Sequence, residues 1–229
     1  MQYKNKEKMA KKIIINESQE KLLGIKLQEA ALDSFSLQEL SNIPSFRGKL
    51  QYCKQMLGQP IGSGSSRITF QIDDEKVLKL AKNEKGIAQN ETEWDPLASQ
   101  NYGMIPKLFE CDENYNWIIV EYVLPAKKAD FQECLGVSFD TYLKFVITVY
   151  NQYARQKAYY ATLSDEEYDY LYENNQWFQD LYYYMADYQL PYGDLIRMAN
   201  LGMCMRNGEP TIVILDSGLN DYVLNKYYR

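Results

Sequence analysis

Apolar and polar residues alternate from Ile68 to Ile72, ahead of four charged residues and a mostly apolar segment, 77–81. Alternation with a period of two predicts a strand with one buried face, and the charged run predicts a turn into a second strand. Lys79 lies in the middle of that second strand. A buried ammonium group is costly unless a partner compensates its charge. The pattern therefore predicts a hairpin whose lysine has a specific partner, such as a phosphate oxygen or a carboxylate on a nearby helix.

Two further short apolar runs, 201–205 and 211–215, predict a pair of strands near the C-terminus. An Asn-Gly pair lies between them, which is a strong hairpin signal because both residues accept positive φ. Such a hairpin returns the chain on itself. We therefore expect Asp216 to lie beside Asp194, although twenty-two residues separate them in the sequence.

Helical periodicity predominates in the middle of the chain. Apolar residues over 139–153 recur at helical spacing on one face and predict a core helix. Ser164 and Glu167 have the spacing of a capping box, which predicts the start of a helix that runs to about Asp187. The segment 159–188 contains more tyrosines than one buried stripe can hold. Two interpretations stay open: a thick aromatic core, or a surface that contacts another protein.

The N-terminal segment has the signature of short helices. Capping-box spacings occur at Asn16 with Gln19 and at Ser36 with Glu39, and a further helix is expected over 46–56. The apolar faces of these helices are too short to be stable alone. They either pack on the adjoining lobe or dock another protein.

Composition excludes several classes of function. The chain has 229 residues, enough to bury a sizeable core, and a formal net charge of −6. An acidic chain has no electrostatic footprint for nucleic acid, so nucleic acid is not an expected partner. The four cysteines lie far apart and there is no histidine, which argues against a structural zinc site. Since no apolar run approaches membrane-spanning length and no signal peptide opens the sequence, we expect a cytoplasmic protein without membrane contact.

Candidate chemistry lies in two motifs. Gly62 and Gly64 precede the first strand, and because they lack Cβ atoms their backbone amides can approach a polyanion. Near the C-terminus, Asp194 is followed by Asn200 and, after the predicted hairpin, by Asp216 in an Asp-x-Gly sequence. An acid, an amide, a hairpin and a second acid in this order are typical of phosphoryl-transfer sites, which need a positioned carboxylate and oxygen-rich metal ligands.

Together with the strand lysine, these motifs resemble the protein-kinase-like superfamily over residues 57–229. The second motif is most similar to the aminoglycoside-phosphotransferase branch, and the whole is similar to small kinase-like proteins encoded by tailed bacteriophages. The resemblance implies an α+β, two-lobed protein-kinase-like fold with a minimal C-terminal lobe and an added helical N-terminal segment. It divides the chain into a helical extension (1–56), an N-lobe of antiparallel sheet and one helix (57–125), and a truncated helical C-lobe with the catalytic-loop hairpin (126–229).

The same resemblance implies a site for ATP. The glycine pair matches the glycine-rich loop, and Lys79 matches the lysine that holds the α- and β-phosphates. The segment 117–123 is similar to the strand that leads into the hinge, where backbone groups meet the adenine edge. The cofactor-binding residues implied in this way are Gly62, Ser63, Gly64, Lys79, Glu121 and Val123.

The resemblance also implies catalytic residues and ligands for Mg²⁺. Asp194 matches the catalytic base, and the helix after the second strand should carry the ion-pair partner of Lys79. Glu91 is the first choice for that partner and Glu93 is the alternative. The implied Mg²⁺ ligands are Asn200 and Asp216.

Four positions depart from the family pattern. Arg67 stands where a third glycine is common, and Tyr192 replaces the usual histidine of the catalytic loop. Asn200 follows Asp194 by six residues where the pattern has five, and Ser217 replaces the phenylalanine of Asp-Phe-Gly. These departures bear on catalysis more than on fold.

The leading hypothesis is an ATP- and Mg²⁺-dependent phosphotransferase with an unknown acceptor. Because only eleven residues follow Gly218, we expect no protein-kinase platform for a peptide substrate. The alternative is a catalytically inactive pseudokinase, in the host cytoplasm or the virion, that serves as a phage structural or host-interaction module. Such a module would bind a protein partner through its tyrosine-rich and N-terminal helices. Transfer of AMP is a third hypothesis.

Overall fold

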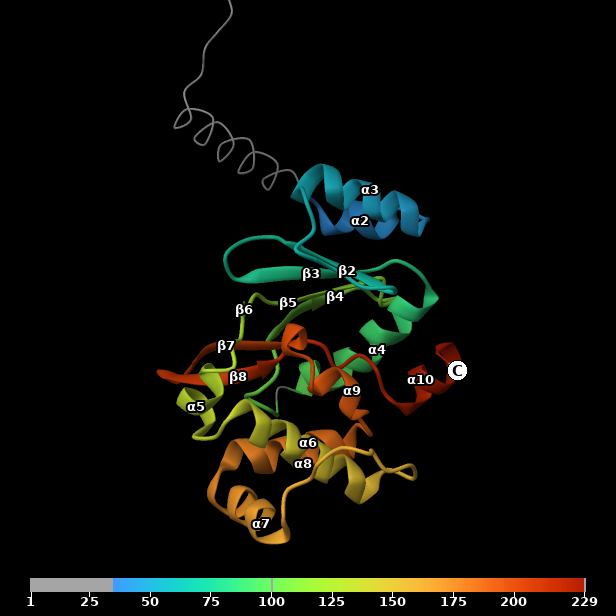
Figure 1. The fold of residues 1–229 in the computed structure, drawn as a ribbon. Coiled ribbons are helices and arrows are strands. Elements are labelled where there is room, and N and C mark those ends of the chain that lie inside the picture. The colour runs from blue at the N-terminus through green and yellow to red at the C-terminus, as the bar shows by residue number, and fades with distance from the viewer. Residues whose placement is uncertain (1–34, 100, 229) are drawn as a thin grey trace, which may run out of the picture.

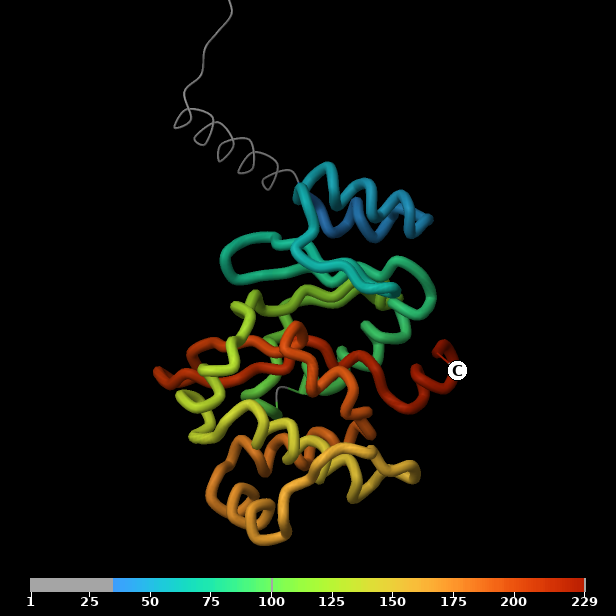
Figure 2. Tube along the Cα trace, viewed as in Figure 1, coloured from blue at the N-terminus to red at the C-terminus, as the bar shows by residue number. Residues whose placement is uncertain are grey.

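The computed structural model describes residues 35–99 and 101–228, which form two antiparallel sheets flanked by helices (Figure 1). The upper sheet has the strand order β1-β2-β3-β5-β4, and the second sheet has the order β6-β7-β8. Figure 2 follows the chain from the upper sheet through β6 into the lower helices, and back to β7 and β8 between the layers. The predicted combination of helices with antiparallel sheet is confirmed. The strands of the upper sheet are β1 (Gly62–Ser63), β2 (Arg67–Gln71), β3 (Lys76–Ala81), β4 (Leu108–Cys111) and β5 (Trp117–Glu121).

The first predicted hairpin is confirmed, because β2 pairs antiparallel with β3. Thr69 lies opposite Lys79 and Phe70 lies opposite Leu78. Since side chains alternate along a strand, these two pairs point to opposite faces of the sheet. Phe70 and Leu78 are fully buried under the N-terminal helices, whereas Lys79 points to the face that packs on α4 (Glu84–Ser99).

Two helices, α2 (Leu37–Asn42) and α3 (Phe46–Leu57), cover the outer face of the upper sheet. Ser36 caps α2 by accepting a hydrogen bond from the Glu39 N–H at 3.3 Å, as the capping-box spacing predicts. The other such spacing, at Asn16, lies outside the described residues. Of the two interpretations of the N-terminal helices, packing on the sheet is therefore confirmed for α2 and α3. The cluster that they share with the sheet includes Leu40, Cys53, Leu57, Ile68, Phe70, Leu78, Leu80, Trp117 and Ile119.

The second predicted hairpin is also confirmed, and its turn is tighter than the apolar pattern indicates. Asn207 and Gly208 alone form the turn, with φ angles of 54° and 89°. Both strands are therefore slightly longer at the turn than expected. The strands of this sheet are β6 (Leu124–Pro125), β7 (Leu201–Arg206) and β8 (Glu209–Ile214).

Helices below the second sheet bury the larger core. The predicted core helix is α6, whose Tyr142, Phe145 and Val146 are fully buried. The helix expected from Ser164 to Asp187 is instead two helices, because Asn175 is extended and caps the second one by accepting from the Trp177 N–H. The other helices and short turns of the described residues are α5 (Asp130–Leu135), α6 (Phe139–Tyr153), α7 (Asp165–Asn174), α8 (Gln176–Asp187), α9 (Tyr192–Leu195), η1 (Met198–Asn200) and α10 (Asp221–Tyr227).

The tyrosines divide between core and surface. Tyr142 and Tyr184 are fully buried, whereas Tyr159, Tyr160 and Tyr170 have more than half of their surface exposed. The segment 159–188 therefore contributes to both core and surface, and contact of its exposed tyrosines with another protein stays a prediction. Among the described helices, none combines the length and apolar character needed to cross a membrane.

Candidate functional site

A buried ion pair links the upper sheet to α4. The Lys79 ammonium contacts the Glu93 carboxylate, and the two side chains are only 9% and 1% exposed. The ammonium also donates to the Leu215 carbonyl at 2.5 Å, so that it reaches the segment after β8. Lys79 thus has the specific partner that its position in an apolar strand predicts.

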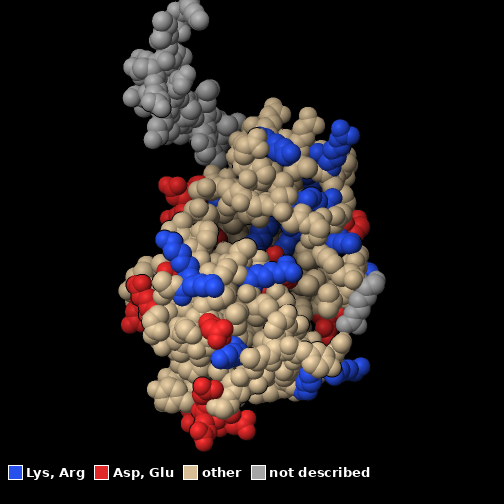
Figure 3. Space-filling model, viewed as in Figure 1, with Lys and Arg blue, Asp and Glu red and all other residues tan. Residues whose placement is uncertain are grey.

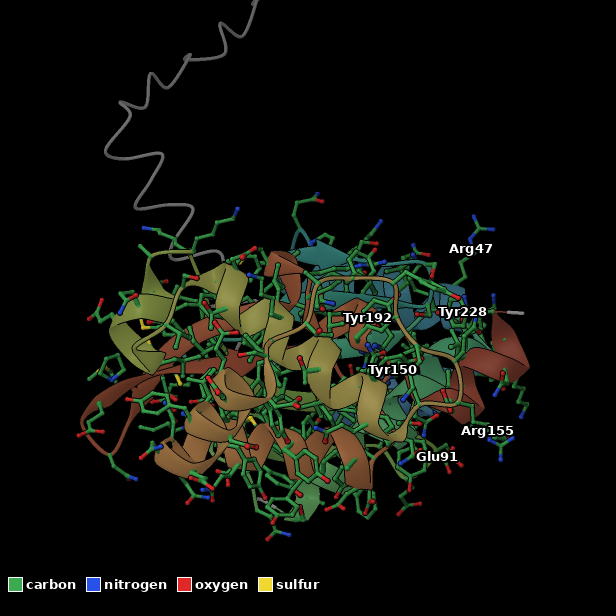
Figure 4. The ribbon with its side chains drawn as sticks, turned by 60° about the horizontal axis from the view of Figure 1, so that its bottom comes forward. Arg47, Glu91, Tyr150, Arg155, Tyr192 and Tyr228 are labelled. Atoms are coloured by element: carbon green, nitrogen blue, oxygen red, sulfur yellow. The ribbon has the colours of Figure 1, made fainter. Side chains whose placement is uncertain are left out.

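Glu91, the first choice from the sequence, is not that partner. It is exposed on α4 and lies at the periphery of the molecule in Figure 4. Residues two apart on an α-helix point about 200° away from each other, so a helix that buries Glu93 must expose Glu91.

The orientation of α4 follows from its closest contact with the sheet. A Cβ on Gly86 would lie 2.3 Å from the Ser66 carbonyl oxygen, so only glycine allows the helix to start there. The buried face of the helix then continues at helical spacing through Gln89, Asn90 and Glu93. This buried stripe is polar, so a search for apolar periodicity does not find it.

Arg67 is a residue of this charged cluster that the sequence analysis does not assign to the site. Its side chain is 8% exposed, and its guanidinium contacts the carboxylates of both Glu93 and Asp216. Nη1 also donates to Asn90 Oδ1 at 3.2 Å. A signal for this role exists in the sequence. Residue 67 is two positions from Thr69, which lies opposite Lys79, so the arginine and the lysine must share one face of the hairpin.

Asp216 lies at the open side of this cluster, with 41% of its side chain exposed. Burial alone would raise the pKa of its carboxyl, but Arg67 and Lys79 together hold that pKa below its usual range. Gly218 makes room for the guanidinium, because a Cβ there would lie 3.1 Å from Arg67 Nη2 and 2.7 Å from the Gln89 carbonyl oxygen. The Asp-x-Gly sequence is therefore needed for packing as well as for charge.

Asp194 belongs to the same electrostatic environment. Burial, and then the charge of Asp216, raise the pKa of the Asp194 carboxyl, while Arg197 and Arg67 oppose the rise. Arg197 Nη1 lies 3.5 Å from Asp194 Oδ1. The side-chain amide of Asn200 donates to the Asp194 carbonyl at 3.1 Å. The short turns α9 and η1 between the two residues bring them together despite the six-residue spacing. The second hairpin thus brings the two acids close enough to influence each other, as expected.

Two other departures from the family pattern have structural explanations. The ring of Tyr192 packs edge-on against Tyr150 and Tyr160, with centroids 4.8 and 5.7 Å away, and Figure 4 shows Tyr150 and Tyr192 close together. Ser217 is buried and accepts a hydrogen bond from the Tyr184 hydroxyl at 2.6 Å. A phenylalanine at position 217 would leave that buried hydroxyl without this partner.

The residues of the site do not fit a divalent cation in this arrangement. Asp216 Oδ1 accepts from Arg67, and a metal ion at this carboxylate would lie beside the guanidinium, where like charges repel. In residues 35–99 and 101–228, no cluster of three or more histidine, cysteine, aspartate or glutamate side chains has metal-binding geometry. Asn200 and Asp216 as ligands of Mg²⁺ therefore stay a prediction from the sequence, and the geometry does not support it.

The glycine-rich loop and the predicted hinge lie outside the charged cluster around Lys79. Gly62 and Ser63 are exposed on β1, and the Gly64 N–H donates to the Arg67 carbonyl at 2.9 Å. At the hinge, the Glu121 carboxylate forms an ion pair with Arg206, and Val123 is only 5% exposed. The role of these residues in adenine binding stays a prediction.

Charge gathers where the layers meet. Figure 3 shows lysine or arginine atoms together with aspartate or glutamate atoms in a hollow near the middle of this face. Two cavities, of about 490 and 340 Å³, lie elsewhere: one between α5 and α6 beside Phe139, the other at the edge of the upper sheet beside Phe109. The first is lined mainly by surface side chains and has no cluster of charges comparable to that around Lys79.

Comparison with known proteins gives a distant structural likeness. No protein-family model and no curated protein matches the sequence. A solved structure, that of the streptomycin–ATP–APH(2″)-IIa ternary complex, is similar with a TM-score of 0.32 and 11% sequence identity, over 74% of this chain and 69% of that one. That protein is an aminoglycoside phosphotransferase. A likeness this weak carries no argument of its own, so the case for function rests on the residues of the site.

Proposed function

We propose that this protein binds the phosphates of ATP at the Lys79 site and transfers the terminal phosphoryl group to a hydroxyl acceptor. The observation that carries the proposal is the buried Lys79–Glu93 ion pair beside Asp216. A protein that needed only stability would gain little from such a pair, since burying two charges costs about as much as their attraction returns. A cation held in place by a buried carboxylate is instead suited to binding a polyphosphate.

Asp194 is the proposed base for the acceptor hydroxyl. Burial and Asp216 raise the pKa of its carboxyl, which makes this carboxylate a better proton acceptor than an ordinary aspartate. Asn200 holds the backbone at that position through its bond to the Asp194 carbonyl. Since phosphoryl transfer depends mainly on positioning and electrostatics, these contacts are the relevant ones.

The first test is nucleotide binding by the purified protein. ATP should raise the melting temperature, because a ligand that binds only the native state stabilises it in proportion to the logarithm of its concentration over Kd. Lys79→Met should abolish that rise. Lys49→Met is the matched control, because Lys49 is also buried but lies on α3, with its ammonium bonded to the carbonyls of Leu40 and Ser41. A rise that survives Lys79→Met, or is lost in Lys49→Met alone, would contradict the proposed site.

A second test separates transfer from binding. Release or transfer of the labelled terminal phosphate of ATP should occur in the natural protein and fall sharply in Asp194→Asn. Arg155→Gln is the control, since Arg155 is an exposed residue outside the site (Figure 4). Turnover that persists in Asp194→Asn would refute the role given to that residue.

A binding module without turnover is the second candidate function. Two observations favour it: Arg197 faces Asp194 at 3.5 Å, and several tyrosines of the lower layer are exposed. Exposed tyrosine provides large contact area at low entropic cost in protein interfaces. Nucleotide binding with no turnover under any condition would select this candidate over the first.

A further inference from the structure

Within the cluster of Lys79, Arg67, Glu93 and Asp216, the two cations balance the two carboxylates without any added ion. Lys79 and Arg67 supply two positive charges, and Glu93 and Asp216 supply two negative charges. Arg67 is central to this balance, because it is the residue that contacts both carboxylates. A guanidinium cannot lose its proton in a protein, so its charge is permanent.

The position of Arg67 is determined by several independent contacts. The hairpin register places it on the face of Lys79, and Asn90 accepts from its Nη1. Gly218 leaves the space that its Nη2 occupies. These contacts come from β2, α4 and the segment after β8, so the guanidinium is fixed at a junction of three elements and is not a mobile surface group.

At a phosphate site, an exposed carboxylate is a liability unless a cation neutralises it. Asp216 faces the open side of the cluster, where phosphates would approach, and like charges at short distance repel. Arg67 already provides this neutralisation. We propose that Arg67 takes the place of a divalent cation at Asp216, so that the protein binds the triphosphate of a nucleotide without a metal ion. The inference rests on the proposed nucleotide site and adds its ion requirement.

A metal ion would bind here only by displacing the guanidinium. Arg67 would then form an ion pair with the Glu93 carboxylate alone, and that carboxylate is already paired with Lys79. The displaced charge would stay in a nearly water-free position, since the Arg67 side chain is 8% exposed. Burial of an incompletely compensated charge is strongly unfavourable, and this opposes metal entry.

The test is isothermal titration of the full-length protein with ATP, in EDTA and in Mg²⁺. For the natural protein the two Kd values should differ by less than about tenfold. Arg67→Gln should weaken binding in EDTA by roughly ten- to hundredfold, the worth of one charge-assisted interaction. Mg²⁺ should restore much of that loss, because the variant exposes the Asp216 carboxylate as a ligand. A variant that gains a metal requirement is a result that a purely structural role of Arg67 does not produce.

Two further variants make the assignment specific. Arg67→Lys retains the charge but not the fork that contacts Glu93 and Asp216 together, so it should bind ATP in EDTA more tightly than Arg67→Gln and less tightly than the natural protein. Adding Asp216→Asn to Arg67→Gln removes the carboxylate that needs neutralising, so the double variant should recover binding in EDTA. The double variant also keeps the inference testable if Arg67→Gln alone does not fold, which circular dichroism of each variant would reveal.

The outcomes distinguish the two levels of the proposal. Binding by the natural protein in Mg²⁺ but not in EDTA would overturn the inference and leave the nucleotide site intact. Absence of binding in both would overturn the proposed function itself. Equal loss in EDTA and Mg²⁺ for Arg67→Gln, with no recovery in the double variant, would show that Arg67 acts on packing and not on the charge of Asp216.

Discussion

Replacing Glu93 by glutamine tests the centre of the charged cluster, because this one carboxylate accepts from both Lys79 and Arg67. The side chain is 1% exposed, so water cannot take over the role of the lost charge. Removing one partner of a buried ion pair destabilises by about 3–5 kcal/mol. Both cations retain other acceptors, Lys79 at the Leu215 carbonyl and Arg67 at Asp216, so we expect a value near the lower end, about 3 kcal/mol.

Glu91→Gln is the matched control for this prediction. It is the same chemical change on the same helix, two residues earlier, at an exposed position. Surface substitutions of this kind usually change stability by less than about 0.5 kcal/mol. Urea denaturation followed by circular dichroism measures both free energies of unfolding directly. In thermal melts, at about 2–4 °C per kcal/mol for a chain of this length, Glu93→Gln should lower the melting temperature by roughly 6–12 °C.

Two results would refute this reasoning. Equal destabilisation by the two substitutions would mean that α4 is not oriented with Glu93 toward the sheet. An unchanged stability in Glu93→Gln would mean that the cations do not depend on this carboxylate. Repeating the comparison at high salt adds a check, because a buried pair is screened much less than an exposed one, so the difference between the variants should persist.

Three further predictions follow from the packing and the charges. In urea denaturation, Gly218→Ala should lower the free energy of unfolding by about 1–3 kcal/mol, because the added Cβ would press on the Gln89 carbonyl. Gly64→Ala is the control: the nearest contact of its Cβ would be 3.8 Å away, so it should change stability by less than about 0.5 kcal/mol. Similar costs for the two substitutions would contradict the packing argument. Asn175→Ala should cost about 1–2 kcal/mol, since it removes the cap of α8 and the bond to the Leu135 carbonyl, and an unchanged midpoint would show that neither bond contributes. The two acids should have opposite pH linkage in urea titrations at several pH values. Because the pKa of Asp194 is raised, its contribution to the free energy of unfolding falls as pH rises above the ordinary aspartate range, so Asp194→Asn should be more stable than the natural protein at neutral pH. Because the pKa of Asp216 is lowered, its contribution is present above that range and is lost as pH falls, so Asp216→Asn should be less stable than the natural protein at neutral pH. The same sign for both would contradict the linkage.

Local patterns account for the parts of the fold that the sequence predicts well. The alternation before Lys79 and the Asn-Gly pair each fix a hairpin through residues close in sequence, and both hairpins form as expected. The helix expected from Ser164 to Asp187 is divided because the Asn175 side chain bonds to Leu135, forty residues away, as well as to the next helix. That contact depends on tertiary structure, so periodicity and caps alone cannot reveal it.

The partner of Lys79 could have been found with one more step of local reasoning. Gly86 and Glu93 are seven residues apart, about two turns of helix, and so share a face, whereas Glu91 does not share it. The sequence pattern did not identify which face was buried, because the buried residues between them, Gln89 and Asn90, are polar. A helix whose buried face carries amide and carboxylate groups cannot be told from a solvent-exposed helix by its apolar periodicity alone.

Arg67 shows why a departure from a family pattern deserves a physical explanation of its own. From the sequence alone it is only a position where a third glycine is common. Its second carboxylate, Asp216, is 149 residues further along the chain, so no local pattern reports the contact. The hairpin register does place Arg67 beside Lys79, and two cations on one face require two anions nearby. That requirement predicts acidic partners for both cations, but it does not say which of the 31 aspartates and glutamates they are, and only the fold identifies Glu93 and Asp216.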